Sequence, residues 1–112
     1  MPEPWDHLMG VLSLPLLSRL LGISAISARR YKVAARTTPD DVAGRLHFLS
    51  LTVADLSGAY NEIGVRQWFD RRRAQLRGRA PSELLKGRWQ PTEPGPRQVC
   101  ALARALTTSH AS

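Results

Sequence analysis

Six arginines fall within fourteen residues between Arg66 and Arg79, in the stretch "RQWFDRRRAQLRGRAPSELL". A guanidinium group stays charged at physiological pH and binds carboxylates and phosphates through two parallel hydrogen bonds. A dense run of such groups suits an acidic partner, which is either nucleic acid or an acidic protein face. The same arginines could also form only a solvated helix surface. Arginine outnumbers lysine fourteen to two in the chain, although a GC-rich genome would produce that bias as well.

Residues that could catalyse a reaction or hold a metal ion are sparse. His7, His47 and His110 are far apart and match no metal-ligand spacing, and no Ser-His-Asp or Cys-His pair is suggested. The single cysteine, Cys100, excludes a disulfide framework and a thiolate metal cluster, and is expected to be a small buried residue on the last helix. We therefore expect a binding protein rather than an enzyme, with no cofactor.

The positive charge is distributed unevenly along the chain. The net charge is +7, and residues 1–64 carry six Lys/Arg against six Asp/Glu. Residues 65–112 carry ten Lys/Arg against three Asp/Glu, so the whole excess lies in the C-terminal half. This half is expected to present the surface that attracts an acidic partner.

The periodicity of the apolar residues predicts an all-α fold. β-branched residues are few and never alternate cleanly with polar ones. We expect helices over 5–12, from Ser13 as a cap to Gly22, from Ser24 as a cap through residue 36, over 65–76 and over 96–107. The apolar stretch "LMGVLSLPLLSRLL" is interrupted by Pro15, follows acidic residues and is too short to span a bilayer. We therefore expect neither a signal peptide nor a membrane anchor, and a cytoplasmic protein.

A long helix is expected after "TTPDDV", with Thr38 as its N-cap and Pro39 at its first position. Its apolar residues recur at spacings of 4, 3, 4, 3, 4 and 3, and Gly64 ends it. They are Val42, Leu46, Leu49, Val53, Leu56, Tyr60 and Ile63. Such a stripe is core or helix-partner surface, and this helix is expected to join an N-terminal region (1–63) to a C-terminal region (64–112).

Residues 14–36 have the layout of a helix-turn-helix, with Gly22 in the turn. Ile26 and Tyr31 are expected to face an apolar seat made by the preceding helix. The second helix of such a motif places its N-terminal residues at base edges in the major groove. The candidate DNA-binding residues are Ser24, Ser27, Arg29, Arg30, Lys32 and Arg36. Many all-α proteins contain two short helices around a glycine, however, so the spacing alone leaves DNA binding open.

The arginine-rich stretch is predicted to fold as a helical hairpin with an apolar inner face. Val65, Trp68, Phe69 and Leu76 anchor its helix, Gly78 and Pro81 set a turn, and Leu84 and Leu85 fold back. Trp68 is either core or an interface anchor, and Trp89, in a proline-rich loop, either anchors a partner or covers the core. The candidate partner-binding residues are Trp68, Arg71, Arg72, Arg73, Arg77, Arg79 and Trp89.

The segment "WFDRRRAQLRGRAPSELL" resembles the signature of the Xre/MbcA/ParS-like toxin-binding antitoxin family. The pattern of Trp-Leu, Leu, Gly-Arg, Pro and Leu-Leu is matched in order, while Ala80 replaces the usual hydroxyl residue and Arg77 with the arginine triplet replaces the usual Pro-Asn character. Family members often place an Xre-like helix-turn-helix upstream, so the resemblance covers about residues 14–106.

The resemblance implies a type II antitoxin that neutralises a RES-domain toxin, an NAD-consuming enzyme, and represses its own operon by binding DNA. The C-terminal domain is then expected to cover the mouth of the toxin's NAD pocket, and the protein is expected to act as a homodimer on paired half-sites. Two alternatives remain open at this point. One is a helix-turn-helix regulator without a toxin partner, and the other is a small helical adaptor that does not bind DNA.

Overall fold

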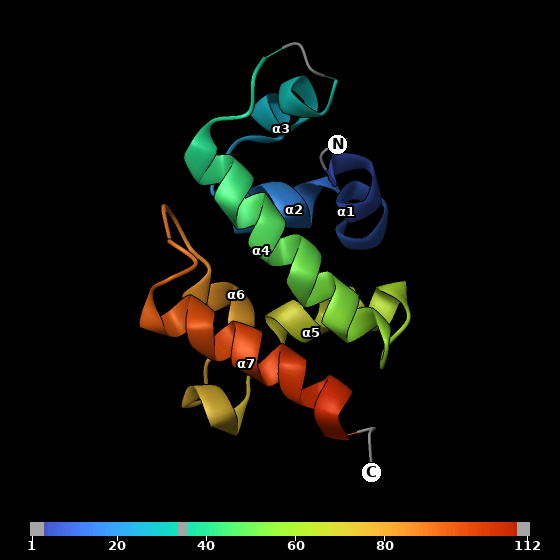
Figure 1. Cartoon of the computed structure of the whole chain (residues 1–112), viewed down its shortest axis with the longest axis vertical. Helices are drawn as coiled ribbons and strands as arrows, with labels where there is room; N and C mark the ends of the chain where they lie inside the picture. Colours follow the sequence, from blue (N-terminus) through green and yellow to red (C-terminus); the bar gives the residue numbers. More distant parts are fainter. Residues whose placement is uncertain (1–3, 34–35, 110–112) are drawn as a thin grey trace.

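Helix α4 (Asp40–Ser57) runs diagonally through the molecule and carries helices on both sides (Figure 1). This computed structural model describes residues 4–33 and 36–109 and measures 44 × 24 × 22 Å. The other elements are α1 (Trp5–Leu12), α2 (Leu14–Leu21), α3 (Ala25–Lys32), α5 (Glu62–Asp70), the 3-10 helix η1 (Ala74–Leu76), α6 (Pro81–Leu84) and α7 (Pro94–Ser109). Over those two ranges there is no strand, only one isolated bridge between Arg73 and Arg79, so the all-α prediction is confirmed.

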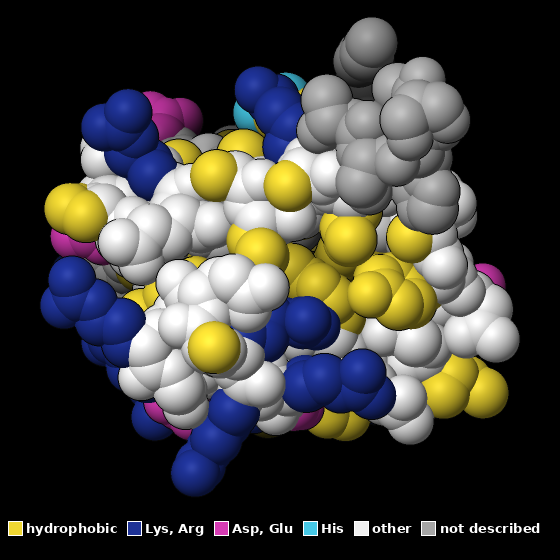
Figure 2. Space-filling model, turned by 90° about the horizontal axis from the view of Figure 1, so that it is seen from below, with side chains coloured by type: hydrophobic (Ala, Val, Ile, Leu, Met, Phe, Trp, Pro, Cys, Tyr) yellow, Lys and Arg dark blue, Asp and Glu magenta, His cyan; other side chains and the backbone are white. Residues whose placement is uncertain are grey.

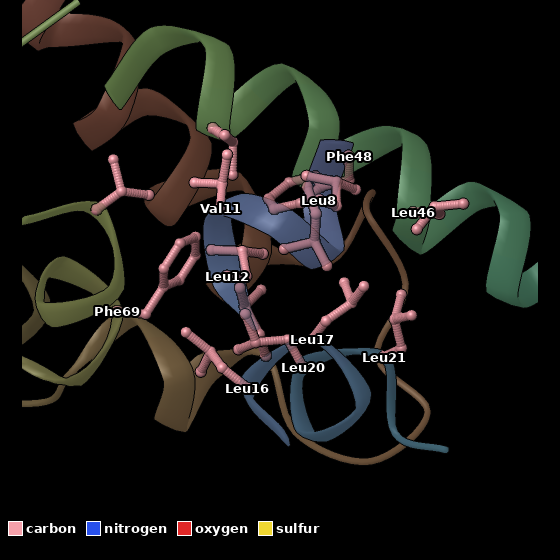
Figure 3. Packing of buried hydrophobic residues seen from close by; sticks show 14 of the residues in the cluster. Leu8, Val11, Leu12, Leu16, Leu17, Leu20, Leu21, Leu46, Phe48 and Phe69 are labelled. Carbon is pink, nitrogen blue, oxygen red and sulfur yellow. The ribbon is translucent and has the colours of Figure 1, made fainter. Parts of the chain in front are cut away.

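The buried side chains form a single core that both halves of the chain share. Helix α1 packs on α5, and α4 packs along α7, so helices from the predicted regions 1–63 and 64–112 bury each other's apolar faces. Figure 3 shows Leu12 of α1, Leu17 of α2 and Phe69 of α5 converging from three elements. Burial of this kind is the main stabilising contribution in a domain of this size.

The predicted helix over residues 42–63 is wrong beyond Ser57. Helix α4 begins at Asp40, with Pro39 rather than Thr38 at the N-cap position, and ends at Ser57. The backbone N–H groups of Ala59 and Tyr60 then both donate to the carbonyl of Leu56, each at 2.9 Å, which closes a turn. The apolar stripe therefore ends at Leu56 as a feature of α4.

A new helix begins where the stripe was expected to continue. The side chain of Asn61 accepts a hydrogen bond from the Gly64 N–H at 2.9 Å and so caps α5. An Asn at this position satisfies a backbone donor that a continuous helix would bond internally, and it thereby favours a break. As a consequence Ile63 lies in the first turn of α5 and is 61% exposed, instead of facing the core.

Other helix boundaries differ from the predictions as well, since α3 ends at Lys32 rather than at residue 36. Helix α2 lies between Ser13 and Gly22 as predicted, but the expected side-chain cap is absent. Ser13 caps no helix with its side chain, and it takes φ 73° and ψ 158° at the corner between α1 and α2. Helix α5 ends at Asp70 rather than at Leu76. Helix α7 begins at Pro94, two residues before the expected start, because a proline in the first turn lacks only an N–H that has no helical partner there. None of the helices in the described ranges has the length and apolarity of a membrane span.

A buried arginine joins the middle of the chain to both of its flanks. Arg45 is 2% exposed, and its Nε donates to the carbonyl of Trp89 at 2.8 Å while its Nη1 donates to the carbonyl of Leu21 at 3.0 Å. The indole N–H of Trp89 donates to the neighbouring carbonyl of Leu20 at 2.7 Å. The last carbonyls of a helix have no partner within it, so these two side chains complete the C-terminal end of α2.

Candidate functional site

Helix α3 is held in place at both of its ends. The Ser24 hydroxyl oxygen accepts a hydrogen bond from the Ser27 N–H at 3.0 Å, which caps the helix as the sequence predicts. Ala28 is fully buried against α2, and Tyr31 packs beside Trp5 with ring centroids 6.2 Å apart. Gly22 turns the chain between α2 and α3 with φ 72°, in the left-handed region that glycine adopts without steric cost.

The outer face of α3 is basic. Arg29, Arg30 and Lys32 are exposed on the helix, Ser24 is exposed at its cap, Ser27 is half-buried, and Arg36 is exposed beyond its C-terminal end. The Lys32 Nζ lies 3.4 Å from a carboxylate oxygen of Asp6, whereas Arg29 and Arg30 have no ion pair within the described part of the chain. The structure thus brings five of the six candidates onto or beside one short helix, with Arg36 beyond it.

The prediction that Ile26 faces the apolar seat is wrong. Its side chain is 64% exposed on α3, in the first turn after the capping Ser24. The physical reason is the cap, because a helix that begins at Ala25 turns position 28 rather than position 26 toward α2. Tyr31 does pack against the core as expected.

The arginine-rich stretch forms a tight, hydrogen-bonded loop instead of a continuing helix. After α5 the backbone is extended at Arg71 and Arg73, and η1 follows. The Arg73 N–H donates to the Arg79 carbonyl at 3.1 Å, and the Gly78 N–H donates back to the Arg73 carbonyl at 2.9 Å. Arg77 takes φ 58° and Gly78 takes φ 80°, so two consecutive left-handed residues close the loop.

The arginines of this loop differ in how much of their charge remains available. The Arg73 guanidinium lies over the Trp68 ring, 5.0 Å from its centroid, and burial lowers the pKa of this group. Its Nε is buried and has no hydrogen-bond partner among the described residues. Arg72 stands 4.0 Å from Glu83, whereas the exposed Arg77 and Arg79 make no ion pair among the residues described.

Both candidate tryptophans belong to the core. Trp68 is 2% exposed and packs edge-on against Phe69, with ring centroids 5.2 Å apart. The prediction of an exposed Trp89 is wrong, because its ring is 3% exposed, packs edge-on against Phe48 and donates to Leu20. The alternative that Trp89 covers the core is the one observed. The two rings therefore contribute to the core rather than to an exposed surface.

A second group of charged residues was not identified from the sequence. Arg19 of α2 donates to both carboxylate oxygens of Asp70 at 3.1 and 2.9 Å, and the Ser82 hydroxyl donates to the same carboxylate at 2.9 Å. The hydrogen bond from Arg19 is the main reason that the pKa of Asp70 lies below its ordinary value, and the bond from Ser82 adds to it. Arg19 and Asp70 are 51 positions apart in sequence, so no local pattern brings them together.

The two basic surfaces lie at different ends of the molecule. In Figure 1, with the longest axis vertical, α3 is at the top and the loop that follows α5, drawn in gold, is at the bottom. Figure 2 views the lower end and shows Lys and Arg side chains gathered around exposed hydrophobic ones. Comparison with known families, curated proteins and solved structures finds no match. The surfaces themselves are therefore the basis for a functional proposal.

Proposed function

We propose that the protein is an antitoxin of the type II class, which binds operator DNA through α3 and neutralises a RES-domain toxin through the loop of residues 71–79. The observation that carries the proposal is the separation of the two basic surfaces along the longest axis (Figure 1). Two surfaces at opposite ends allow DNA and a protein to be held at the same time. The division into regions 1–63 and 64–112 stays a prediction, since both regions share one core.

The chemistry of α3 supports its role in DNA binding. Arg29 and Arg30 are exposed and unpaired among the described residues, and a guanidinium can donate two hydrogen bonds to the O6 and N7 atoms of guanine. Ile26 adds an exposed apolar side chain of the kind that contacts the methyl group of thymine. Ser24 and Lys32 are suited to phosphate contacts that fix the register. As a homodimer, the protein would bind two half-sites about one helical turn apart.

The loop of residues 71–79 supports a protein partner rather than a second DNA contact. Its backbone is fixed by the hydrogen bonds between Arg73, Gly78 and Arg79, so the arginine side chains project from a rigid frame. Preorganised arginines lose little entropy on binding, which favours a specific carboxylate pattern over a uniform phosphate backbone. The sequence resemblance to the toxin-binding family rests on the same residues.

The proposal is tested by producing this protein and the product of the adjacent reading frame together in the cytoplasm of a bacterial host. We expect the neighbouring gene to encode a RES-type toxin. This toxin should deplete cellular NAD when it is produced alone and should not do so when this protein is also present. Toxicity that persists in the presence of soluble protein would rule the antitoxin out. A different result would favour the regulator without a toxin. In that case the protein would retard the promoter fragment in a gel-shift assay, and the neighbouring gene product would not be toxic.

Matched variants separate the two surfaces. Replacing Arg29 and Arg30 by Ala is expected to weaken operator binding by about 1–3 kcal/mol for each base-reading arginine and to leave toxin neutralisation intact. Replacing Arg77 and Arg79 by Ala is expected to have the opposite pattern. Loss of both activities in either variant, with the fold intact by circular dichroism, would contradict the assignment of one function to each end.

A further inference from the structure

A groove separates the corner between α1 and α2 from the outer side of α5. It has a volume of about 540 Å³ and is open to solvent. Ser13 and Leu16 line it on one side, Arg66, Asp70 and Arg71 line it on the other, and Arg19 reaches across. The groove holds three guanidinium groups against one carboxylate, which makes it an electropositive depression rather than an apolar one.

The three arginines contribute to the groove in different ways. Arg19 is neutralised by its bidentate pair with Asp70. The side chain of Arg66 is fixed by hydrogen bonds from its Nε to the Val11 carbonyl at 2.7 Å and from its Nη2 to the Gly10 carbonyl at 3.3 Å. Neutral carbonyls orient this guanidinium, and its Nη2 also forms an exposed i,i+4 ion pair with Glu62 at 3.7 Å.

Arg71 supplies a second guanidinium group. It follows the last residue of α5, is exposed, and makes no ion pair within residues 4–33 and 36–109. An incoming anion therefore meets one immobilised guanidinium at Arg66 and one adaptable guanidinium at Arg71. This combination allows two charge-assisted hydrogen bonds to a single carboxylate group.

Ser13, at the rim of the groove, has a strained backbone conformation. Its φ of 73° with ψ of 158° is a conformation that almost only glycine adopts, and it costs about 1–3 kcal/mol in other residues. Glycine would make the same corner without that strain. The serine side chain caps no helix, so its hydroxyl is available at the rim of the groove to donate a hydrogen bond.

We propose that this groove binds a glutamate- or aspartate-bearing segment of a protein partner. A single carboxylate can be held between Arg66 and Arg71. A phosphate dianion carries more negative charge and would be repelled more strongly by the carboxylate of Asp70, which also lines the groove. Leu16 and the aliphatic stem of Arg66 offer apolar contact for the residue next to the acid. The volume suits a small ligand or a few residues of a peptide. The identity of the partner rests on the proposed function, but the groove itself can be tested alone.

The test is an NMR titration of the full chain, labelled with ¹⁵N, by the peptide acetyl-Leu-Glu-Leu-amide. The amides of Ser13, Gln67 and Arg71 are expected to shift together and to saturate in the millimolar range, which corresponds to about 4 kcal/mol. The matched peptide with Gln in place of Glu is expected to cause no saturating shift. Inorganic phosphate is the third ligand.

Two charge-matched variants decide whether the groove is specific. Arg71→Gln is expected to weaken binding of the Glu peptide at least about fivefold, because it removes one charge-assisted hydrogen bond. Arg88→Gln removes the same charge from an exposed position outside the groove lining, and is expected to leave the affinity unchanged. Equal weakening by both variants would reduce the effect to general charge attraction and overturn the proposal.

Other outcomes overturn it as well. Absence of shifts at the groove with the Glu peptide, or equal shifts with the Gln peptide, would exclude a carboxylate site. Tighter binding of phosphate than of the Glu peptide at the same amides would replace it by a phosphate site. If the protein binds the Glu peptide specifically but does not neutralise the toxin, only the proposed function is contradicted. If the Arg71→Gln variant neutralises the toxin as well as wild type does, the groove has no part in that function.

Discussion

Arg45 and Trp89, 44 residues apart, are joined by a buried hydrogen bond of 2.8 Å from the guanidinium Nε to the backbone carbonyl. Both side chains then continue to adjacent carbonyls of α2, Arg45 to Leu21 and Trp89 to Leu20. Together they bind the end of a helix that precedes α3. The position of the basic helix is therefore set by residues from the middle and the last third of the chain.

Replacing Arg45 by Met tests this arrangement. The variant keeps the apolar stem but leaves the carbonyls of Leu21 and Trp89 without their donor, so the free energy of unfolding should fall by about 2–4 kcal/mol. Chemical denaturation followed by circular dichroism measures it. The control is Arg30→Met, an identical change at an exposed position, which should stay within about 0.5 kcal/mol of wild type. Equal stability of the two variants would contradict a structural role for Arg45.

Gly22→Ala is expected to be strongly destabilising, by about 2–4 kcal/mol. Its φ of +72° disfavours any side chain, and an added Cβ would overlap the backbone carbonyl oxygen of Gly87. Gly44→Ala is the matched control, because nothing lies within 4 Å of its added Cβ and it is in the interior of α4. That variant should gain about 0.5–1 kcal/mol from helix propensity. Thermal denaturation of both should show shifts of opposite sign.

Arg77→Gly separates stability from partner binding. The left-handed φ of 58° at Arg77 costs a non-glycine residue, so the glycine variant should be as stable as wild type or more stable by up to about 1 kcal/mol. Neutralisation of the toxin should nevertheless weaken, because an exposed guanidinium is lost. Denaturation midpoint and co-expression are measured on the same variant. Unimpaired neutralisation would exclude Arg77 from the interface.

The bond between Arg19 and Asp70 predicts a dependence of stability on pH. The pKa of Asp70 is lowered in the folded state, mainly by the hydrogen bond from Arg19, so the contribution to stability is present above the ordinary carboxyl pKa of 3.8 and is lost as the pH falls below it. Both side chains are about half exposed, at 54% and 50%, which limits the contribution to roughly 1 kcal/mol or less. Asp70→Asn should flatten the acidic limb of a stability–pH profile. An unchanged limb would show that the pair is screened by solvent.

Ile26→Ala tests the apolar contribution of α3 to DNA binding. Because the side chain is 64% exposed, stability should change by less than about 0.5 kcal/mol. Affinity for operator DNA should fall by about threefold to tenfold, and the preference for thymine over uracil in that DNA should shrink, since uracil lacks the methyl group. Leu51→Ala is the control, as Leu51 is 50% exposed on α4. If both variants weaken operator binding to a similar extent, the effect comes from removing exposed apolar surface in general and not from a contact of Ile26 with DNA.

The sequence was informative where a feature is local. The helical content, the Ser24 cap and the turn at Gly22 follow from residue types within a few positions of each other, and the structure has all of them. The break of α4 was missed because the spacing of apolar residues continues across it. The Asn61 cap, a local signal that was available, ends the helix against that periodicity.

The burial of Trp89 and the pairing of Arg19 with Asp70 depend on the three-dimensional packing instead. A tryptophan between glycine and proline-rich residues has the composition of an exposed loop residue, and only the position of the α2 end makes it core. Likewise, the sequence shows Arg45 only as one more charged residue on a helix. Its structural role depends on the carbonyls of Leu21 and Trp89, which come from two distant segments. Contacts of this separation have no signature in the spacing of a single sequence.

The closure of the α2 end by Arg45 and Trp89 also constrains synthesis. A ribosome releases the basic helix long before it releases the tryptophan that helps to fix it, and α7, which packs along α4, emerges after both. The end of the molecule that carries α3 is therefore not complete until Trp89 has left the exit tunnel. By then the loop of residues 71–79 is already outside the tunnel, so the two basic ends of the molecule are completed together rather than in turn.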